Sequence, residues 1–567
     1  MHVQTTAIMR GHVVQPCVKR AVGSPSMGGS AETAAPRLVA TEPPPDHYYA
    51  DNLLLLLESV HRQYDDLLTP EERAFGATVA ALSDEAQRLF ARLIGRKGPV
   101  VRVDTLAYRE VPRCDEALGE LVEAGLVLAC PEAPVEALLG RGRRAELERW
   151  YPVEAPAGRK DALVDAILAR YPETVVRSRF AWHCPWVTLA APERLELYRL
   201  LFFGDRRSDL AAFVVRDLGI VRYENYALCR ERRLFPDRAA LDAWLALARI
   251  GDYVEELGAA PQPEPAALVV EALWHPARAR LLERRRSRIL NRLARRLERS
   301  GALDDALTCY ARSTASPARE RTARILKRLG DDAGLEGLRV TMRERPRSAL
   351  ERDFAERFGA PRAAPQYAID DFAWDPSYAT RVEAAAAETL AARGGDVWHL
   401  ENALPLGLFG LAYWEWVFAP VDGVFVNAFQ NAPIDLFWPD FFATRRGLCD
   451  DPLALDDASL RAAMLATAES RRGIANRLVD WRALDAGTLH RVLAGIPMAD
   501  VRRLLAIVAE DLDRARTGFP DLTAVYEDGS YEFAEVKGPT DQLRRHQRLW
   551  IDRLRAADLP VRVLRFR

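Results

Sequence analysis

Two short stretches near the C-terminus decide the fold of this chain: Gly518-Phe519-Pro520-Asp521-Leu522 and Glu535-Val536-Lys537-Gly538-Pro539. Between them, Leu522 to Tyr526 is short and apolar, and Tyr531 to Val536 alternates and is rich in residues that favour strands. The dipeptide Asp528-Gly529, which separates them, is a strong hairpin turn signal. The pattern therefore predicts two antiparallel strands joined by a tight turn.

The side chains of this hairpin place charged groups together. Because successive residues of a strand point to opposite faces, Glu535 and Lys537 share one face, and Asp521, at the mouth of the neighbouring strand, can reach it. Hard divalent cations such as Mg²⁺ prefer oxygen ligands, so we expect Asp521, Glu535 and the backbone carbonyl of Val536 to bind one against a phosphate. Lys537 is suited to orienting a water molecule and stabilising developing charge.

The composition of the chain supports a functional role for Lys537. Only five of the 79 basic residues are lysines and the other 74 are arginines, so Lys537 stands out between two residues of the expected site. The alternative is a surface hairpin in which the carboxylate and the lysine form an exposed ion pair of little energetic value.

The segment after the hairpin extends the pattern. Thr540 is a plausible N-cap for a helix that continues to Ala557, with Leu543, Trp550 and Leu554 at helical spacing. Leu559 to Phe566 follows as a closing strand. A β-hairpin, a helix and a strand that carry these residues resemble the core of the PD-(D/E)xK nuclease fold.

A narrower resemblance rests on several segments beside the hairpin. They are Glu535-Val536-Lys537-Gly538-Pro539-Thr540-Asp541, His546-Gln547-Arg548-Leu549-Trp550, His399-Leu400-Glu401, Asn427-Ala428-Phe429-Gln430, Pro433-Ile434-Asp435-Leu436, Phe441-Phe442 and Arg445-Arg446. Over roughly residues 396–567 the chain resembles the virus-type replication-repair nuclease (VRR-NUC) domain, and more narrowly the Fanconi-associated nuclease family in a bacterial form. The resemblance implies that Glu401 is a third acidic metal ligand.

The resemblance implies more about function than the spacing of the site residues alone. It implies a Mg²⁺- or Mn²⁺-dependent nuclease that cuts 5′-flap or branched DNA, works as endonuclease and 5′–3′ exonuclease, leaves 5′-phosphates and takes part in interstrand crosslink repair. Two alternatives remain at this stage. The chain could be a resolvase of four-way junctions, which as a rule acts as a symmetric dimer, or a non-catalytic DNA-binding scaffold.

Composition excludes several other classes. A net charge of −2 gives no global basic field, so DNA binding must come from local patches. The seven cysteines are scattered singly, which fits a reducing cytoplasm. The resemblance implies that this is the cytoplasm of a bacterium, where the protein would associate with the nucleoid. No Walker loop is present, so no nucleotide cofactor is expected. No membrane segment is expected either, because Pro405 and Glu415 break the most apolar run, from Ala403 to Ala419.

The length of the chain and the Pro- and Gly-containing breaks between its helical patterns predict a multidomain protein. We expect it to be mainly α-helical in its N-terminal and middle regions, with a C-terminal α/β nuclease domain. The expected divisions are a disordered tail at 1–45, a winged-helix-like region at 46–130, a SAP-like DNA-binding module at 131–175, a helical connector at 176–236, TPR-like (tetratricopeptide) helical repeats at 237–364 and the nuclease domain at 365–567. The tail contains only Cys17, so the ubiquitin-binding zinc finger of eukaryotic relatives is not evident.

Two groups of basic residues are candidate DNA contacts. In the SAP-like module they are Arg141, Arg143, Arg144, Arg159 and Lys160, which surround the start of its second helix. In the middle region ten arginines fall between Pro276 and Arg299, and the candidates there are Arg284, Arg285, Arg286 and Arg288. The alternative for both groups is a solvated face in an arginine-biased chain.

The same middle region predicts helical repeats. Gly301 followed by Ala302-Leu303 and, seven positions on, Tyr310 resembles the turn of a TPR repeat, and Gly330 occupies the equivalent place in a degenerate second copy. Two or three helical hairpins are expected here, followed by a linker at 359–364.

Overall fold

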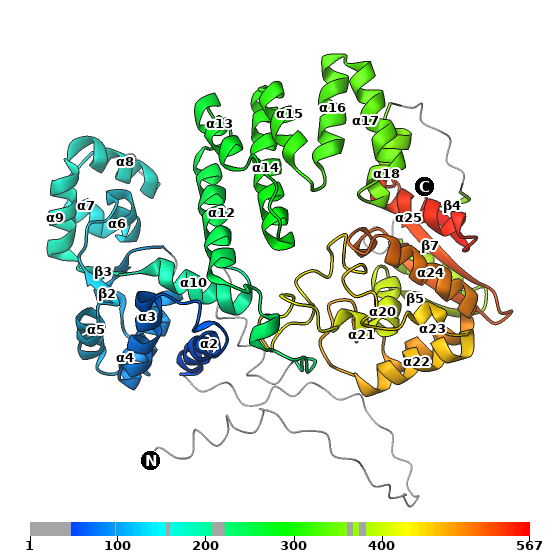
Figure 1. Ribbon diagram of the computed structural model, residues 1–567, viewed down its shortest axis with the longest axis horizontal. Coiled ribbons are helices and arrows are strands. Elements are labelled where there is room, and N and C mark those ends of the chain that lie inside the picture. The colour runs from blue at the N-terminus through cyan, green and yellow to red at the C-terminus, as the bar shows by residue number, and fades with distance from the viewer. Residues whose placement is uncertain (1–46, 97, 155–158, 207–220, 360–366, 374–381) are drawn as a thin grey trace, which may run out of the picture. The chain divides into compact units, whose positions relative to one another are not determined.

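The structure, a computed structural model, describes residues 47–96, 98–154, 159–206, 221–359, 367–373 and 382–567 (Figure 1). The tail predicted for residues 1–45 and most of the linker predicted at 359–364 lie outside this part of the chain. The described residues are mainly helical, and their strands form one sheet of three strands and one of five.

The N-terminal region consists of helices with a small sheet. Its elements are α2 (Tyr48–Tyr64), α3 (Pro70–Ala81), α4 (Asp84–Ile94), β1 (Val101–Arg102), α5 (Cys114–Glu123) and β2 (Val127–Ala129). Both short strands pair with β3 (Trp186–Leu189), giving the order β1-β3-β2. Ser83 caps α4 by accepting a hydrogen bond from the backbone N–H of Ala86 at 3.3 Å.

Among the described residues, four helices lie in the chain between β2 and β3. They are α6 (Val135–Arg141), α7 (Arg144–Trp150), α8 (Lys160–Arg170) and α9 (Glu173–His183). Their apolar side chains form a core of their own, which includes Trp186. Residue 175, where the expected SAP-like module ends, lies inside α9, and Val176 and Phe180 of this helix belong to the same core.

The middle region continues as helices. They are α10 (Pro192–Phe203), α12 (Arg238–Glu256), α13 (Pro263–Ala272), α14 (Arg280–Ser300), α15 (Leu303–Arg312), α16 (Ala318–Leu329), α17 (Asp332–Glu344) and α18 (Ala349–Arg357). From α14 to α18 each helix packs against the next. α14 and α16 end at Gly301 and Gly330, both in the left-handed conformation, with φ of 94° and 75°. The two glycines predicted to be equivalent therefore have the same role.

The C-terminal region is built on the five-stranded sheet. Its strands are β4 (Ile369–Phe372), β5 (Gly395–His399), β6 (Leu522–Tyr526), β7 (Tyr531–Lys537) and β8 (Val561–Phe566), in the order β4-β8-β7-β6-β5. The hairpin of β6 and β7 is antiparallel, as predicted, and β8 pairs parallel to β7. β5 adds antiparallel to β6, and β4 adds parallel to β8 at the opposite edge. The sheet is therefore mixed, with β7 at its centre.

Helices cover both faces of this sheet. They are α19 (Val382–Ala391), α20 (Ala403–Ala412), α21 (Trp414–Val417), α22 (Asp457–Ser470), α23 (Ala486–Gly495), α24 (Met498–Glu510) and α25 (Arg545–Ala556). Ala534 and Val536 of β7 share a core with α19. Tyr531 and Phe533, on the other face, share the larger core with α20 and α22 to α25. Since side chains alternate, Glu535 and Lys537 belong to this second face.

One expectation for this region needs correction. The helix after the hairpin begins at Arg545 and not near Thr540, because Asp541 instead closes a turn by accepting a hydrogen bond from the backbone N–H of Gly538 at 3.3 Å. The apolar run from Ala403 to Ala419 forms two helices that meet at Tyr413. Among the described residues, no helix combines the length and the apolar character needed to cross a bilayer.

Candidate active site

The sheet brings together residues that are far apart in sequence. In the pairing of β5 with β6, His399 stands opposite Leu522, and the backbone N–H of Glu401 donates to the carbonyl oxygen of Asp521 at 3.3 Å. Glu401 has a positive φ of 44°, a conformation that costs energy for a residue with a side chain and is often found at functional sites. The chain thus turns sharply at the end of β5 and leaves Glu401 beside Asp521.

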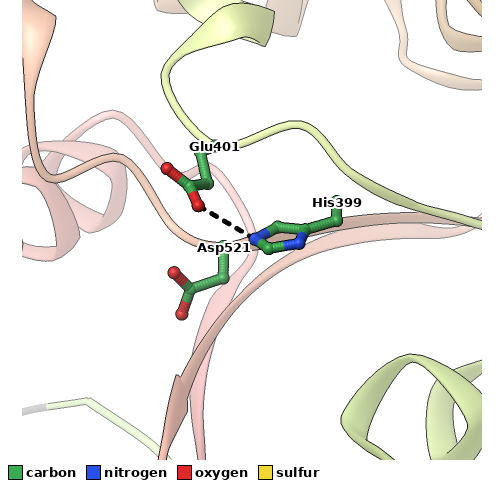
Figure 2. A group of neighbouring side chains, drawn as sticks. All are labelled: His399, Glu401 and Asp521. Carbon is green, nitrogen blue, oxygen red and sulfur yellow. Dashed lines mark ion pairs between the residues drawn. The ribbon is translucent and has the colours of Figure 1, made fainter. Parts of the chain in front are cut away.

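Three side chains meet at this point (Figure 2). His399, Glu401 and Asp521 each have a potential metal-binding atom, and these atoms all lie within 4.8 Å of one another. The Nε2 atom of His399 is 3.0 Å from Oε1 of Glu401. His399 was not among the predicted site residues, although its place two residues before Glu401 in a His-x-Glu pattern was a usable signal.

Glu535 and Lys537 form the second part of the site. The Glu535 side chain is completely buried, and Nζ of Lys537 lies 2.7 Å from its Oε1 atom. Among the described residues, neither Glu535 oxygen takes part in a hydrogen bond of ordinary geometry. Burial, reinforced by the nearby charge of Asp521, raises the pKa of Glu535 to about 7. A buried carboxylate with so few donors is suited to a cation.

Asp521 is held between the two parts. Its Oδ2 atom accepts a hydrogen bond from the backbone N–H of Val536 at 2.8 Å. The N–H and C=O of one strand residue point to the same edge, so the Val536 carbonyl is directed to the Asp521 side of β7. Burial raises the pKa of Asp521, and the charge of Glu401 adds to the effect. The predicted residues Glu401, Asp521, Glu535, Val536 and Lys537 are therefore all found at one end of the sheet.

Residues around the site fix the loop that carries Asp521. Gly518 has φ of 96°, and a Cβ atom there would lie 2.8 Å from the backbone of His546, so only glycine fits. Phe519 packs edge-on against Phe533 and Trp550, with ring centroids 5.0 and 5.1 Å apart. The amide oxygen of Asn402, which sequence reasoning missed, accepts a hydrogen bond from the backbone N–H of Phe519 at 3.1 Å.

A divalent cation fits this donor set. The site contains three carboxylates, a backbone carbonyl and an imidazole, and Mg²⁺ and Mn²⁺ favour oxygen donors. The strongest sign is Glu535, whose buried oxygens lack ordinary donors even though Lys537 is close.

The basic residues predicted in the SAP-like module lie together. Nζ of Lys160 donates to the carbonyl oxygen of Gly140 at 2.6 Å, and Arg144 donates to the carbonyl oxygen of Arg159 at 3.0 Å. The ends of α6, α7 and α8 therefore form one basic patch, consisting of Arg141, Arg143, Arg144, Arg159 and Lys160. Part of its charge is balanced, since Arg144 pairs with Glu148 at 2.7 Å.

The predicted contacts on α14 are placed differently. Arg286 is 3% exposed and donates to the carbonyl oxygen of Leu273, so it belongs to the interior, which corrects the expectation of a DNA contact for this residue. The guanidinium of Arg284 lies over Trp438 and that of Arg285 over Trp244, at 4.9 and 3.8 Å from the ring centroids. Arg288 is the exposed member of the four.

Comparison with protein families assigns the class. The VRR-NUC domain model matches residues 456–567, and the model described as the HTH domain of FAN1 matches residues 47–128. The mixed sheet, the acidic cluster and this match define a nuclease that hydrolyses DNA phosphodiester bonds, and the VRR-NUC domain implies use of a divalent metal ion.

Comparison with individual proteins assigns the family. A Fanconi-associated nuclease 1 homolog of Pseudomonas aeruginosa is 32% identical over 90% of this chain and 94% of its own, and one from Arabidopsis thaliana is 24% identical over 93% and 67%. A crystal structure of paFAN1 bound to a 2-nt 5′-flap DNA with a gap matches with a TM-score of 0.83 and 32% identity, over 92% of this chain and 98% of paFAN1. The chain belongs to the Fanconi-associated nuclease 1 family.

Proposed function

We propose that this enzyme is a Mg²⁺- or Mn²⁺-dependent nuclease that cuts 5′-flap or branched DNA near the junction and trims DNA in the 5′–3′ direction. The observation that carries the proposal is the convergence of Glu401 and Asp521 beside the buried, donor-poor carboxylate of Glu535. The oxygen-rich donor set supports Mg²⁺ or Mn²⁺ as the metal.

The roles of the site residues follow from their positions. Glu401, Asp521, Glu535 and the carbonyl of Val536 would hold the cation, and His399 would orient Glu401 or join it as a ligand. When bound, such an ion neutralises charge on the phosphate and makes water more acidic.

Lys537 completes the chemistry. Its ammonium group, 2.7 Å from Glu535, would orient the attacking water and stabilise charge on the phosphate oxygens. Attack in line with the departing 3′ oxygen leaves a 5′-phosphate on the product.

The substrate class is supported by solved relatives. Crystal structures of paFAN1 hold 5′-flap DNA with a gap, and this chain matches them over more than nine tenths of its length, at 31–32% identity. We extend that substrate to this chain, together with a role in interstrand crosslink repair at the bacterial nucleoid. The basic patch of the SAP-like module would grip duplex phosphates.

The repeats from α12 to α18 would serve as a TPR-like scaffold. Arg280, in the first turn of α14, donates to Oδ1 of Asp440 at 2.8 Å, and its guanidinium lies 5.2 Å from the ring of Trp438. Arg545 of α25 pairs with Glu320 of α16 at 3.3 Å. Contacts at two places would keep the scaffold in register with the nuclease domain.

Cleavage of end-labelled DNA tests the proposal. The substrates are a 5′-flap, a 3′-flap, a four-way junction and a single strand, each with Mg²⁺, Mn²⁺ or EDTA, for the wild type and Asp521→Ala. We expect metal-dependent incision near the 5′-flap junction that is lost in Asp521→Ala. Binding of all substrates without cleavage by the wild type would overturn the proposed function.

A further inference from the structure

A second basic surface lies between α14 and α16, further toward the C-terminal end of α14 than the arginines discussed above. A hollow of about 540 Å³ opens there. Six arginines line it: Arg292, Arg295, Arg296 and Arg299 from α14, and Arg321 and Arg324 from α16. We call this surface the arginine groove.

The carboxylates near the arginine groove do not balance its charge. Glu298 is shared, since it accepts hydrogen bonds from Arg295 and Arg321, each at 3.0 Å. Glu255 is shared in the same way by Arg292, at 2.6 Å, and Arg296.

Two members of the groove have no acidic partner. Arg299 and Arg324 are exposed, and no carboxylate of the described residues lies within ion-pair distance of either. Arg324 rests over the rings of Phe354 and Phe358, with centroid distances of 5.1 and 5.4 Å, which leaves its nitrogen atoms available. The groove therefore has an excess of positive charge.

The chemistry of the lining favours phosphate. A guanidinium presents a planar fork of donors that matches a phosphate, and several in one hollow suit a chain of phosphates. The rest of the lining is Asn291, Tyr310, Pro317 and Glu320, and the carboxylate of Glu320 pairs with Arg545 of α25 at 3.3 Å.

The groove is continuous with the nuclease domain. Arg324 also lines a neighbouring hollow of about 220 Å³, whose other walls include Arg545 and Arg548 of α25. His546, in the first turn of α25, packs against Gly518 in the loop that carries Asp521. Basic residues of α25 therefore lie between the candidate active site and α16.

We infer that the arginine groove is a second DNA-binding site, which holds backbone phosphates of one arm of the substrate. The inference rests on the proposed function and deepens it, because it names a surface that binds a DNA arm only when the arm is long enough to reach it. Cleavage chemistry does not require this contact, whereas affinity for DNA with a long arm does.

The test uses the double variant Arg299→Gln/Arg324→Gln in the full chain. Its matched control is Arg249→Gln/Arg328→Gln, in which an exposed arginine of α12 and one of α16 outside the groove lose the same charge. Fluorescence anisotropy in EDTA measures the Kd for 5′-flap DNA over a range of salt concentrations, with each arm shortened in turn. Thermal unfolding verifies that both variants are folded.

For the groove variant we expect Kd for long-armed DNA to rise about tenfold, and the slope of log Kd against log salt to fall by about 2, one for each lost phosphate contact. Shortening one particular arm should remove the difference from wild type, and the control should behave as wild type. Equal Kd and slope for variant and wild type on every substrate would overturn the inference.

Two further outcomes separate this site from its rivals. If polyglutamate binds the wild type but not the groove variant, while DNA affinity is unchanged, the groove serves an acidic protein and the inference is wrong. Cleavage of short-armed flap DNA by the groove variant at the wild-type rate supports the inference. Loss of that cleavage would show a catalytic role for the groove and would contradict the inference. Failure of the wild type to cleave bears on the proposed function instead.

Discussion

The carboxylate of Asp521 accepts a hydrogen bond from the backbone N–H of Val536, with 2.8 Å between Oδ2 and N. The pair of Leu522 with Ala534 is the last backbone pair of the hairpin on the side away from its turn. Beyond this pair, the side chain of Asp521 replaces the backbone carbonyl as the partner of β7. The carboxylate is thereby fixed to the strand that carries Glu535 and Lys537. Any ion shared by the two strands would find its ligands already oriented, with little reorganisation needed.

Asp521→Asn should abolish cleavage and spare DNA binding. The amide keeps the size of the side chain but removes the negative charge, and metal stabilisation of several kcal/mol corresponds to a rate loss of about 10³-fold or more. Single-turnover cleavage of 5′-flap DNA measures the rate, and anisotropy in EDTA measures binding. Asp528→Asn, in the exposed turn of the same hairpin, should cleave normally. Retained cleavage by Asp521→Asn would remove this residue from the site.

Glu535→Gln should stabilise the metal-free protein at neutral pH while it stops cleavage. Burial raises the pKa of Glu535 from 4.5 to about 7, so the folded state holds this proton more tightly than the unfolded state does. The free energy of unfolding should therefore fall as pH rises from about 4.5 to 7, by about 3 kcal/mol, and remain low above that range. The glutamine variant lacks this titration.

Thermal unfolding in EDTA at pH 5, 6, 7 and 8 measures the effect of Glu535. The midpoint of Glu535→Gln should exceed that of the wild type at pH 8, and the difference should shrink toward pH 5. Glu527→Gln, an exposed glutamate of the same hairpin, is the control and should follow the wild type. A constant difference across the four pH values would contradict the prediction.

His399→Ala should weaken metal binding. The imidazole lies 3.0 Å from Glu401, and a group that orients or joins a metal ligand typically contributes about 10- to 100-fold in affinity. Titration calorimetry with Mn²⁺ measures this directly, without reference to turnover. His490→Ala removes an exposed histidine from α23 and should leave the affinity unchanged. Equal Mn²⁺ affinity in wild type and His399→Ala would assign His399 a structural role only.

Local sequence was sufficient to predict the central strands of the sheet but not its edge strands, β4 and β5. The turn at Asp528-Gly529 and the alternation of β7 are properties of neighbouring residues, so the hairpin was predicted correctly. β4 pairs with β8, nearly two hundred positions later in the chain, and no local pattern encodes that pairing. β5 is short and half-exposed, so it lacks a clear hydrophobic alternation.

The site shows the same division. Asp521, Glu535 and Lys537 were found because a hairpin brings them together, whereas Glu401 came from family resemblance alone. His399 depends on the register between β5 and β6, which is a tertiary property. On α14, the high number of arginines did not indicate which guanidinium groups contact neighbouring helices and which remain exposed. Arg286 turned out to be enclosed by its own protein.

Loss of Arg445 should destabilise the nuclease domain. Arg445 and Asp435 are both completely buried, and their bidentate pair has distances of 2.8 and 2.9 Å. Arg445 also donates to the carbonyl oxygens of Trp416 and Phe441, so it joins three segments of the domain. After Arg445→Met, Arg280, at 3.4 Å, is the basic side chain that remains near the buried Asp435 carboxylate among the described residues, and the loss of Arg445 should cost about 3–5 kcal/mol.

Chemical unfolding monitored by tryptophan fluorescence measures this cost. Because the penalty comes mainly from the orphaned carboxylate, the double variant Arg445→Met/Asp435→Leu should recover a large part of the stability lost by Arg445→Met. Arg446→Met, at the neighbouring exposed position, is the control and should change stability by less than about 0.5 kcal/mol. If the double variant is no more stable than Arg445→Met, the packing of the arginine stem, and not the charge of Asp435, holds these three segments together.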